Sequence, residues 1–237
     1  MKKYELTGET RIIQNGCEET ELHRIRAVKT FWGVRSGDIG GWIESEECLS
    51  HDGEAWVYGD AIVSGKAHIC DNAKVYDNAE VYGSARICGD AKVYGSARVC
   101  GDAKVCSNAR VYGDAKVCDD ARIYGSAWIF GDARVCGNAR VCGNAWICGN
   151  AKICGDARVY LKESVLTVGP MGSRNDFTTF CSGEKEILVK CGCFCGSISE
   201  FLEKVRETHG DGKHALVYQA AAEVARRQII PQGVDGA

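Results

Sequence analysis

The chain has 237 residues, a net charge of −3 at neutral pH and 26% charged residues, so we expect one elongated domain with a small second one and not a nucleic-acid binder. No apolar run approaches the length of a membrane span, and the start, MKKYELTGE, lacks the apolar core of a signal peptide. Fifteen cysteines without secretory context favour a reducing compartment, so we expect a cytoplasmic protein with no membrane partner.

Residues 1–54 are predicted to form an N-terminal β cap. Short segments of strand-forming residues lie at 3–6, 11–13, 22–28 and 41–43. The next segment of the chain is repetitive, and the open end of a repeat array exposes its core and unpaired strand edges. We therefore expect these strands to cover the first repeat.

A strict six-residue period runs through residues 55–160. Alanine occupies position 55 and every sixth residue to Ala157, and Val or Ile occupies position 57 and every sixth residue to Val159. The pattern Ala-Lys/Arg-Val/Ile-Tyr/Cys alternates as in a strand, and the next two residues are mostly Gly-Asp, Gly-Asn or Gly-Ser, which form turns. Each of these eighteen hexads is predicted to be a short strand plus a corner.

Such short strands are stable only when they stack. Ordering one residue costs about 1–2 kcal/mol of backbone entropy, and burying one Val or Ile returns only about 1.5–3 kcal/mol. Three hexads per coil would give a triangular parallel β-helix of about six coils, in which residues eighteen apart are neighbours at about 4.8 Å. Val165 still occupies the aliphatic position of the repeat, but Glu163 stands where alanine is expected. We therefore place the β-helix at 55–165.

When residues eighteen positions apart are grouped into columns, aromatic and thiol side chains fall into different columns. The column that follows the aliphatic residue on one face reads Tyr58, Tyr76, Tyr94, Tyr112, Phe130, Cys148, and the other two columns are rich in cysteine. The residue before the aliphatic position on the aromatic face reads Trp56, Lys74, Lys92, Arg110, Trp128, Trp146.

Large exposed apolar strips are rare on monomers, and aromatic residues are enriched at interfaces. We therefore predict a homo-oligomer, a dimer or a trimer, that assembles through this face. A purely structural aromatic ladder is the alternative. The predicted oligomer face comprises Trp56, Tyr58, Tyr76, Tyr94, Tyr112, Trp128, Phe130 and Trp146.

Residues 166–230 are predicted to form a small α+β domain, followed by a tail at 231–237. Strands are expected at 166–168, 177–181 and 187–191. A helix is expected at 198–208, where Ser197 and Glu200 form a capping box. A second helix is expected at 215–230, because Pro231 cannot continue it.

The segment GPMGSRNDFTTF is the best candidate for a small-ligand site. Arg174 offers a planar fork for phosphate or carboxylate, and Asp176 suits a sugar hydroxyl. The neighbouring Phe177 and Phe180 favour a nucleotide-like, anionic ligand. The predicted ligand-binding residues are Ser173, Arg174, Asn175, Asp176, Thr178 and Thr179. The alternative is a polar loop that pins the small domain onto the end of the β-helix. His209, Asp211 and His214 are weaker candidates on a neighbouring loop.

Catalytic, metal and cofactor sites are not expected. His68 is the only histidine of the array and belongs to an outward basic column, and no nucleophile or phosphate-binding motif has its required context. Cys191, Cys193 and Cys195 are interpreted as one packed or partly exposed strand face, because zinc sites prefer C-x₂₋₄-C pairs. The array thiols are expected to be free, and acids interleaved with its basic columns favour a solvated surface over polyanion binding.

The run VYGDAKVCDDARIYGSAWIFGDARV resembles the hexapeptide-repeat proteins that form left-handed parallel β-helices. The stretches GGWIE near the N-terminus, and GSRND with CGCF near the C-terminus, resemble an uncharacterised bacterial and phage group of these proteins. The resemblance implies the handedness and a bacterial or phage-infected host cell. Acyltransferases of this fold usually place a histidine near a groove between subunits and carry projecting loops, but no loop interrupts 55–160.

We therefore predict a non-catalytic oligomeric β-helix whose C-terminal domain captures a small anionic, nucleotide-like ligand. A phage protein that sequesters a host immune signal is one version of this hypothesis. The alternatives are an acyl- or nucleotidyl-transferase of the hexapeptide-repeat class and a purely structural scaffold.

Overall fold

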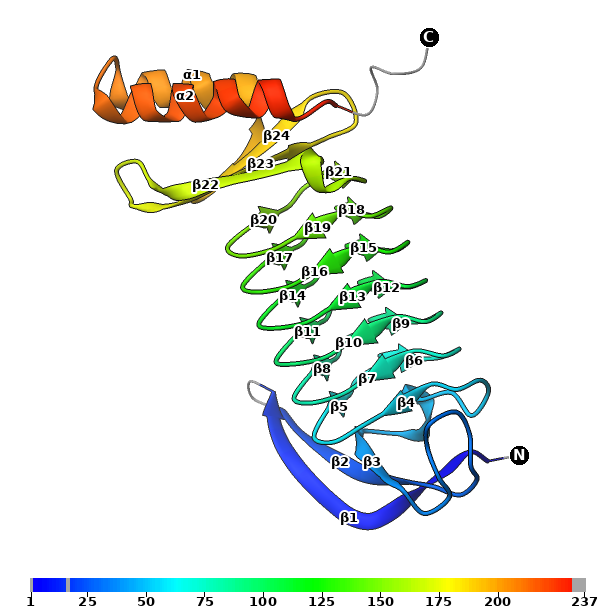
Figure 1. Cartoon of the computed structure of the whole chain (residues 1–237). Helices are drawn as coiled ribbons and strands as arrows, with labels where there is room; N and C mark the ends of the chain where they lie inside the picture. The colour runs from blue at the N-terminus through cyan, green and yellow to red at the C-terminus, as the bar shows by residue number, and fades with distance from the viewer. Residues whose placement is uncertain (1, 16–17, 232–237) are drawn as a thin grey trace.

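A computed structural model describes residues 2–15 and 18–231. It shows a column of stacked parallel coils with an antiparallel sheet at one end and two helices lying across the other (Figure 1). The fold is mainly β, as the hexad pattern predicts. The column has about seven turns.

Three parallel sheets form the sides of the column, and successive strands of each sheet come from successive coils. The first sheet contains β5 (Ile62–Val63), β8 (Glu80–Val81), β11 (Arg98–Val99), β14 (Lys116–Val117), β17 (Arg134–Val135) and β20 (Lys152–Ile153). The second contains β4 (Trp56–Val57), β7 (Lys74–Val75), β10 (Lys92–Val93), β13 (Arg110–Val111), β16 (Trp128–Ile129) and β19 (Trp146–Ile147). The third contains β6 (His68–Ile69), β9 (Arg86–Ile87), β12 (Lys104–Val105), β15 (Arg122–Ile123), β18 (Arg140–Val141) and β21 (Arg158–Val159).

The stacking register is eighteen residues, so the prediction of three hexads per coil is confirmed. Val93 lies opposite Val75 on one side and Val111 on the other. The amide of Tyr76 donates to the carbonyl of Val93 at 3.1 Å, and the same bond repeats one coil later. The alanine and the Val or Ile of every hexad point into the column and are almost completely buried. The core is therefore a continuous apolar rod.

The N-terminal cap differs from its prediction in two ways. Segments 3–6 and 11–13 belong to one bent strand, β1 (Tyr4–Asn15), which pairs with β2 (Glu18–Ala27). Strand β3 (Ile39–Ile43) then pairs in parallel with β5, and after the short 3-10 helix η1 (Glu46–Cys48), Leu49 forms a bridge to Ile69. The cap thus supplies an additional turn of the column, which the predicted count of about six coils did not include.

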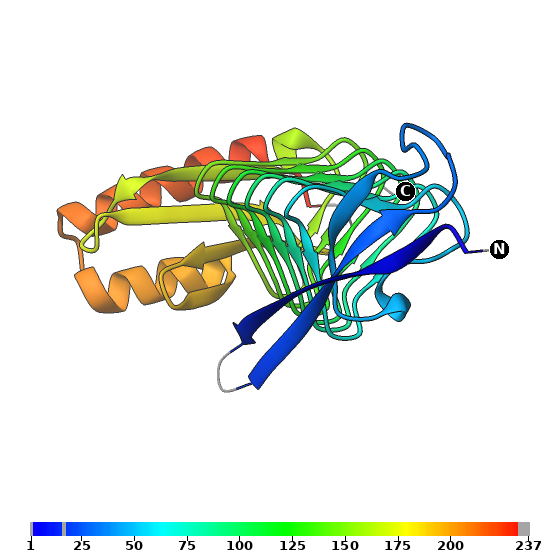
Figure 2. The same cartoon turned by 90° about the horizontal axis from the view of Figure 1, so that it is seen from below.

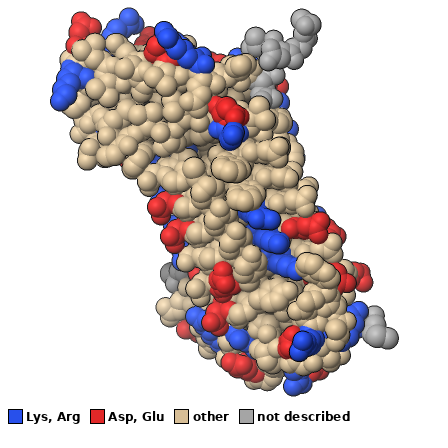
Figure 3. All heavy atoms as spheres, viewed as in Figure 1, with Lys and Arg blue, Asp and Glu red and all other residues tan. Residues whose placement is uncertain are grey.

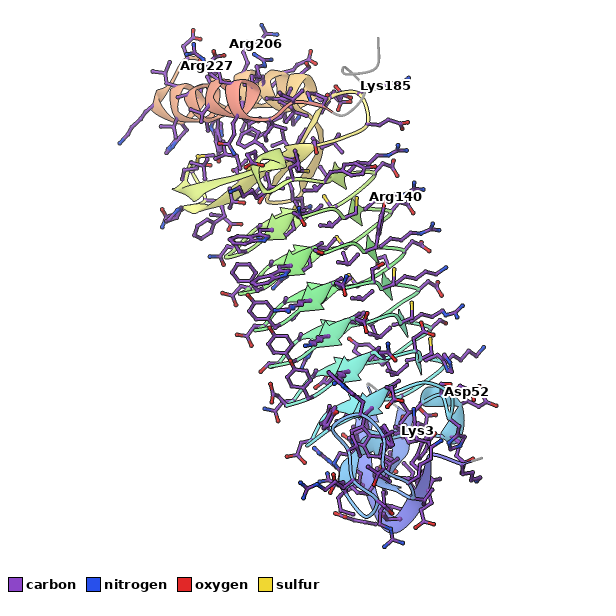
Figure 4. All side chains as sticks on the ribbon, turned by 45° about the vertical axis from the view of Figure 1, so that its right-hand side comes forward. Lys3, Asp52, Arg140, Lys185, Arg206 and Arg227 are labelled. Carbon is purple, nitrogen blue, oxygen red and sulfur yellow. The ribbon has the colours of Figure 1, made fainter. Side chains whose placement is uncertain are left out.

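Polar contacts from the start of the chain join the segments of the cap to one another and to the first hexad. Lys3, labelled in Figure 4, is buried, and its ammonium donates to the carbonyl of Ala55 at 2.8 Å. The Tyr4 hydroxyl donates to the carbonyl of Leu49 at 2.8 Å. Trp56 packs edge-on against Tyr4 and Phe31 and is only 1% exposed. The prediction that Trp56 lies on an exposed strip is therefore wrong, because the cap covers it.

The C-terminal domain begins where the short 3-10 helix η2 (Lys162–Ser164) ends the column. An antiparallel sheet of β22 (Val165–Met171), β23 (Asp176–Ser182), β24 (Ile187–Cys191) and β25 (Phe194–Ser197) follows. Helices α1 (Ile198–His209) and α2 (Lys213–Gln228) cover the face of this sheet that points away from the column (Figure 1). The view along the column shows that the domain projects well beyond one side of it (Figure 2).

The sequence predicted three of these four strands and both helices, with small differences at the ends. The capping box of Ser197 and Glu200 is present. Strand β25 was not predicted, and Cys191, Cys193 and Cys195 do not share one strand face as expected. Cys191 ends β24, Cys193 lies in the turn and Cys195 lies on β25. Of the predicted tail, residues 232–237 lie outside the described residues.

Candidate functional site

The candidate ligand segment forms the turn between β22 and β23, far out on the projecting domain. Met171 pairs with Asp176, and Gly172–Asn175 close the turn between them. Gly172 has a φ of +71°, and a Cβ built on it would lie 1.8 Å from the hydroxyl oxygen of Tyr218 on α2. Only glycine lets the turn come this close to the helix. The turn therefore lies directly against the helical layer.

A pocket of about 420 Å³ opens between this turn, the β24–β25 turn and the two helices, a volume that suits a small ligand. Its wall combines three groups that carry or can carry positive charge with aromatic rings. The lining residues are Ser173, Arg174, Cys191, Cys193, Phe194, Phe201, Lys204, Val205, Thr208, His209 and Tyr218. None of these described lining residues is acidic.

The guanidinium of Arg174 lies close to the β24–β25 turn, where the facing residue is glycine. A Cβ on Gly192 would lie 2.8 Å from Nη1 of Arg174. Lys204 comes from α1 and pairs with Glu207 at 2.9 Å on the exposed surface of the helix, a pair that solvent weakens. The positive charge at this site is therefore available to an anion.

Tyr218 is the centre of the aromatic wall. Its ring packs edge-on to Phe201 at a centroid distance of 5.5 Å and stacks near His209 at 5.9 Å. Burial, together with the neighbouring Cys191, raises the pKa of Tyr218 to about 12. The hydroxyl therefore stays protonated at neutral pH and can donate a hydrogen bond to an acceptor in the pocket.

The structure divides the six predicted ligand residues into two groups. Ser173 and Arg174 line the pocket, and Asn175 sits in the turn with a φ of 49° but is not among the lining residues. Asp176, Thr178 and Thr179 lie on β23 and bond elsewhere. Thr178 is buried and donates its hydroxyl hydrogen to the sulfur of Cys191 at 3.2 Å.

Asp176 and Thr179 contact the last coil of the column. The backbone amide of Lys152 donates to the hydroxyl oxygen of Thr179 at 3.0 Å, and the Lys152 ammonium pairs with Asp176 at 3.4 Å. The amide of Phe177, and then Lys152, lower the pKa of Asp176. Asp176 and Thr179 therefore fit the alternative interpretation, in which this polar segment pins the small domain onto the end of the β-helix.

Several pocket residues were not found from the sequence. Phe201, Lys204, Val205 and Thr208 lie at helical spacing on one side of α1, so that side was recognisable as a face but not as a pocket wall. Phe194 lies on the strand that was not predicted. His209 was a weaker candidate and does line the pocket, whereas Asp211 and His214 are not among the lining residues.

The aromatic face of the column is a ladder of stacked rings with a column of cations beside it. The rings of Tyr94 and Tyr112 are 4.8 Å apart with an interplanar angle of 4°, and Phe130 continues the stack. Figure 4 shows this row of rings along one edge of the column and sulfur atoms along another. Beside the rings, Lys74, Lys92 and Arg110 form the basic run visible over the middle of the column in Figure 3.

A hollow of about 810 Å³ follows this ladder, and its lining includes both basic and acidic groups. Lys74 and Lys92 line it, and so do Asp60 and Asp77. Trp32 of the cap lies over the ammonium of Lys74 at 3.5 Å. The mixed charge makes this hollow a weaker anion site than the pocket of the C-terminal domain.

His68, the histidine that a transferase would need, is held by the cap. Its Nδ1 lies 2.7 Å from the carbonyl oxygen of Glu47. The rest of the array consists of hexads without a projecting loop, as the unbroken succession of two-residue strands shows. This arrangement gives the acyltransferase alternative no support.

The repeat, the coil geometry and the comparisons with known proteins together define the class: this chain is a hexapeptide-repeat β-solenoid protein. The family model described as the YdcK β-solenoid repeat matches residues 85–101 and 133–149, both within the column. The chain is also similar to the "Uncharacterized acetyltransferase YdcK" of Escherichia coli (strain K12), with 35% identity over 80 residues. This match covers 29% of the chain and 24% of the relative.

Among the described residues, no helix has both the length and the apolar character needed to cross a membrane.

Proposed function

We propose that this protein is a non-catalytic binding protein that captures a small anionic, nucleotide-like ligand in its C-terminal domain. The observation that carries the proposal is the pocket in which Arg174, Lys204 and His209 surround an aromatic wall without an acidic residue among its described lining. All residues that line this pocket belong to the projecting C-terminal domain.

The charges define the anionic part of the ligand. Arg174 presents a planar fork that binds phosphate or carboxylate through two hydrogen bonds, and Lys204 adds a mobile point charge. His209 lies in the last turn of α1 and lines the same pocket. Three groups from two elements thus converge on one anion.

The rings define the other part. Phe194 and Phe201 are 5.6 Å apart, and Tyr218 completes the apolar wall. A planar heterocycle can stack on such a wall, while the Tyr218 hydroxyl and Ser173 supply hydrogen bonds. A phosphate attached to a base satisfies both halves of the pocket, and this chemistry includes nucleotide signals that a phage protein would sequester from its host.

The column has the role of a rigid support that assembles through its aromatic face. Trp146 is 48% exposed and stacks on Trp128 at 5.5 Å, which leaves an apolar surface near the C-terminal end of the column. Monomers seldom leave large apolar surfaces uncovered. We therefore assign self-association to the Trp128–Trp146 region and not to Trp56.

Calorimetric titration tests the binding proposal. The probes are ATP, AMP, cyclic AMP, a cyclic dinucleotide and inorganic phosphate. At least one nucleotide should bind more tightly than phosphate, and Arg174→Ala should weaken it by roughly 10- to 100-fold, since a charged hydrogen bond contributes about 1.5–3 kcal/mol.

Arg206→Ala is the matched control, because Arg206 lies on α1 but is not among the residues that line the pocket. The affinity of the Arg206→Ala variant for the nucleotide should equal that of the unmodified protein. Absence of binding by every probe, or an equal loss in both variants, would contradict the proposal.

Acetyl transfer is the second candidate, favoured only by the name of the similar Escherichia coli protein, an uncharacterised acetyltransferase. It predicts release of free coenzyme A from acetyl-CoA with an amine or sugar acceptor, and loss of that release in His68→Ala. Turnover that depends on His68 would replace the binding proposal with this one.

A further inference from the structure

Two cysteines from different parts of the chain meet at the junction of the column and the C-terminal domain. Cys154 follows β20 in the last coil, and Cys195 lies on β25. Their sulfur atoms are 2.6 Å apart, although 41 positions separate them in the sequence. This is closer than two unbonded sulfur atoms pack and near the roughly 2.05 Å of a disulfide.

The pair differs from the other neighbouring thiols of the column. Cys118, Cys136 and Cys154 are successive members of one ladder, in which the amides of Cys118 and Cys136 donate to carbonyls of the next coil. Ladder side chains run parallel at strand spacing, about 4.8 Å, so their sulfurs do not approach bonding distance without backbone movement. Cys195 instead approaches Cys154 from a separate element.

The surroundings of the pair suit thiol chemistry at one of the two sulfurs. Cys195 is exposed, whereas Cys154 is partly buried, and this burial raises the pKa of Cys154. Lys190 pairs with Cys195 across β24 and β25, and its positive charge acts against that rise. Because Cys195 is the more exposed of the two thiols, it is the sulfur that a reagent in solution reaches first.

We propose that Cys154 and Cys195 form a reversible disulfide that ties β25 to the last coil, with a small-molecule disulfide of the glutathione class as oxidant. The Cys195 thiolate attacks one sulfur of the oxidant, forms a mixed disulfide and releases one thiolate. Cys154 loses its proton to solvent and attacks the Cys195 sulfur, which releases the second thiolate. Two protein thiols are oxidised, and one small disulfide is reduced to two thiols.

The cross-link changes how the domain is held. In the reduced state, β23 carries the contacts to the last coil, through Thr179 and Asp176 with Lys152. The disulfide adds a covalent tie through β25, which leads directly into α1 at Ser197. This strand also carries Phe194. Oxidation therefore restrains the strand between the column and the first helix, whether or not the pocket binds a nucleotide.

Peptide mapping of the folded protein tests the proposal. The full chain is equilibrated in buffers of reduced and oxidised glutathione, free thiols are alkylated, and the digest is analysed by mass spectrometry. The oxidised sample should contain a peptide pair joined through Cys154 and Cys195, with the loss of two hydrogen masses. Hydrogen exchange of the amides of residues 194–197 should slow upon oxidation.

Cys154→Ser and Cys195→Ser should each abolish this cross-link and the exchange difference. Serine suits the ladder, because Ser64 occupies the equivalent position in the same column. Cys148→Ser is the matched control, since Cys148 is an exposed thiol one hexad earlier, and it should leave the cross-link intact. Ladder cross-links such as Cys118–Cys136 at equal yield, or no cross-link in the oxidised protein, would overturn the proposal.

Discussion

The rings of Tyr76 and Tyr94 are stacked face to face, with centroids 4.8 Å apart and an interplanar angle of 3°. The two residues are eighteen positions apart and lie on adjacent coils, at the spacing of neighbouring strands. Every other statement about the column depends on this register, because it decides which side chains share a face. The same register places the thiols in ladders and brings Cys154 to the end of one of them.

The buried rod of aliphatic residues should dominate the stability of the column. Ile129 lies on β16, between β13 and β19, and is fully buried. Ile129→Ala leaves a cavity between fixed coils and should lower the free energy of unfolding by about 2–5 kcal/mol in urea denaturation. Ile12→Ala is the control, because Ile12 is exposed on β1, and it should change stability by no more than about 0.5 kcal/mol. Equal losses would contradict the buried core.

The contact between the β22–β23 turn and α2 depends on Gly172. Gly172→Ala introduces a Cβ that collides with Tyr218, so the ring or the turn must move, and any binding in the pocket should be lost. Gly210→Ala is the matched control. Gly210 also has a positive φ, but the space around it is open, so only the backbone strain of about 1–3 kcal/mol applies. Thermal unfolding should show a larger decrease for Gly172→Ala, and equal decreases would argue against the collision.

The hydroxyl of Thr179 should hold the domain against the last coil. Thr179→Val removes the acceptor of the Lys152 amide, and an unsatisfied buried donor costs about 1–3 kcal/mol. Hydrogen exchange at the Lys152 amide should accelerate. Thr178→Val changes the neighbouring, equally buried threonine, whose hydroxyl donates to Cys191, so exchange at Lys152 should stay unchanged. Acceleration in both variants would mean that the whole strand, and not this bond, is responsible.

Stability should fall at alkaline pH because of the partly buried thiols of the column. Burial raises the pKa of Cys118 from its ordinary value of 9.0 to about 12 and that of Cys88 to about 11. Between pH 9 and these values the unfolded chain has released protons that the folded chain retains, so the free energy of unfolding decreases as pH rises. Below about pH 9 this contribution is fully present.

Urea denaturation across this pH range measures the effect. The midpoint should decline above about pH 9, and Cys118→Ala should make the decline shallower because one of the retained protons is gone. Cys148→Ala removes an exposed thiol and should leave the slope as it is. A midpoint that rises with pH would have the wrong sign for retained thiol protons.

Self-association should depend on Trp146 and not on other exposed tryptophans. Trp146→Ser removes the outermost ring of the Trp128–Trp146 stack and should convert an oligomer to a smaller species in light scattering. Trp32→Ser is the control, because Trp32 is 68% exposed but belongs to the cap. If the unmodified protein is a monomer, the aromatic face is not an interface. The same conclusion follows if the two substitutions change the size of the oligomer equally.

Much of the column could be predicted because its information is local and repeated. Each hexad carries its own aliphatic residue, small alanine and corner, so one rule applied eighteen times gives the strands, the core and the register. The cap lacks this repetition. There the pairing of Ile43 with Val63 adds a turn, and the burial of Trp56 under Tyr4 and Phe31 depends on segments distant in the sequence.

The same division applies to the candidate site. Residue types in one loop were enough to nominate Ser173 and Arg174. Only the tertiary structure decided that Lys204, His209 and Tyr218 meet that loop, that Thr179 faces the column instead, and that Cys195 reaches Cys154. The physical reason is that a strict repeat determines its neighbours by counting, whereas the meeting of a turn, two helices and a coil end is determined by how whole elements pack.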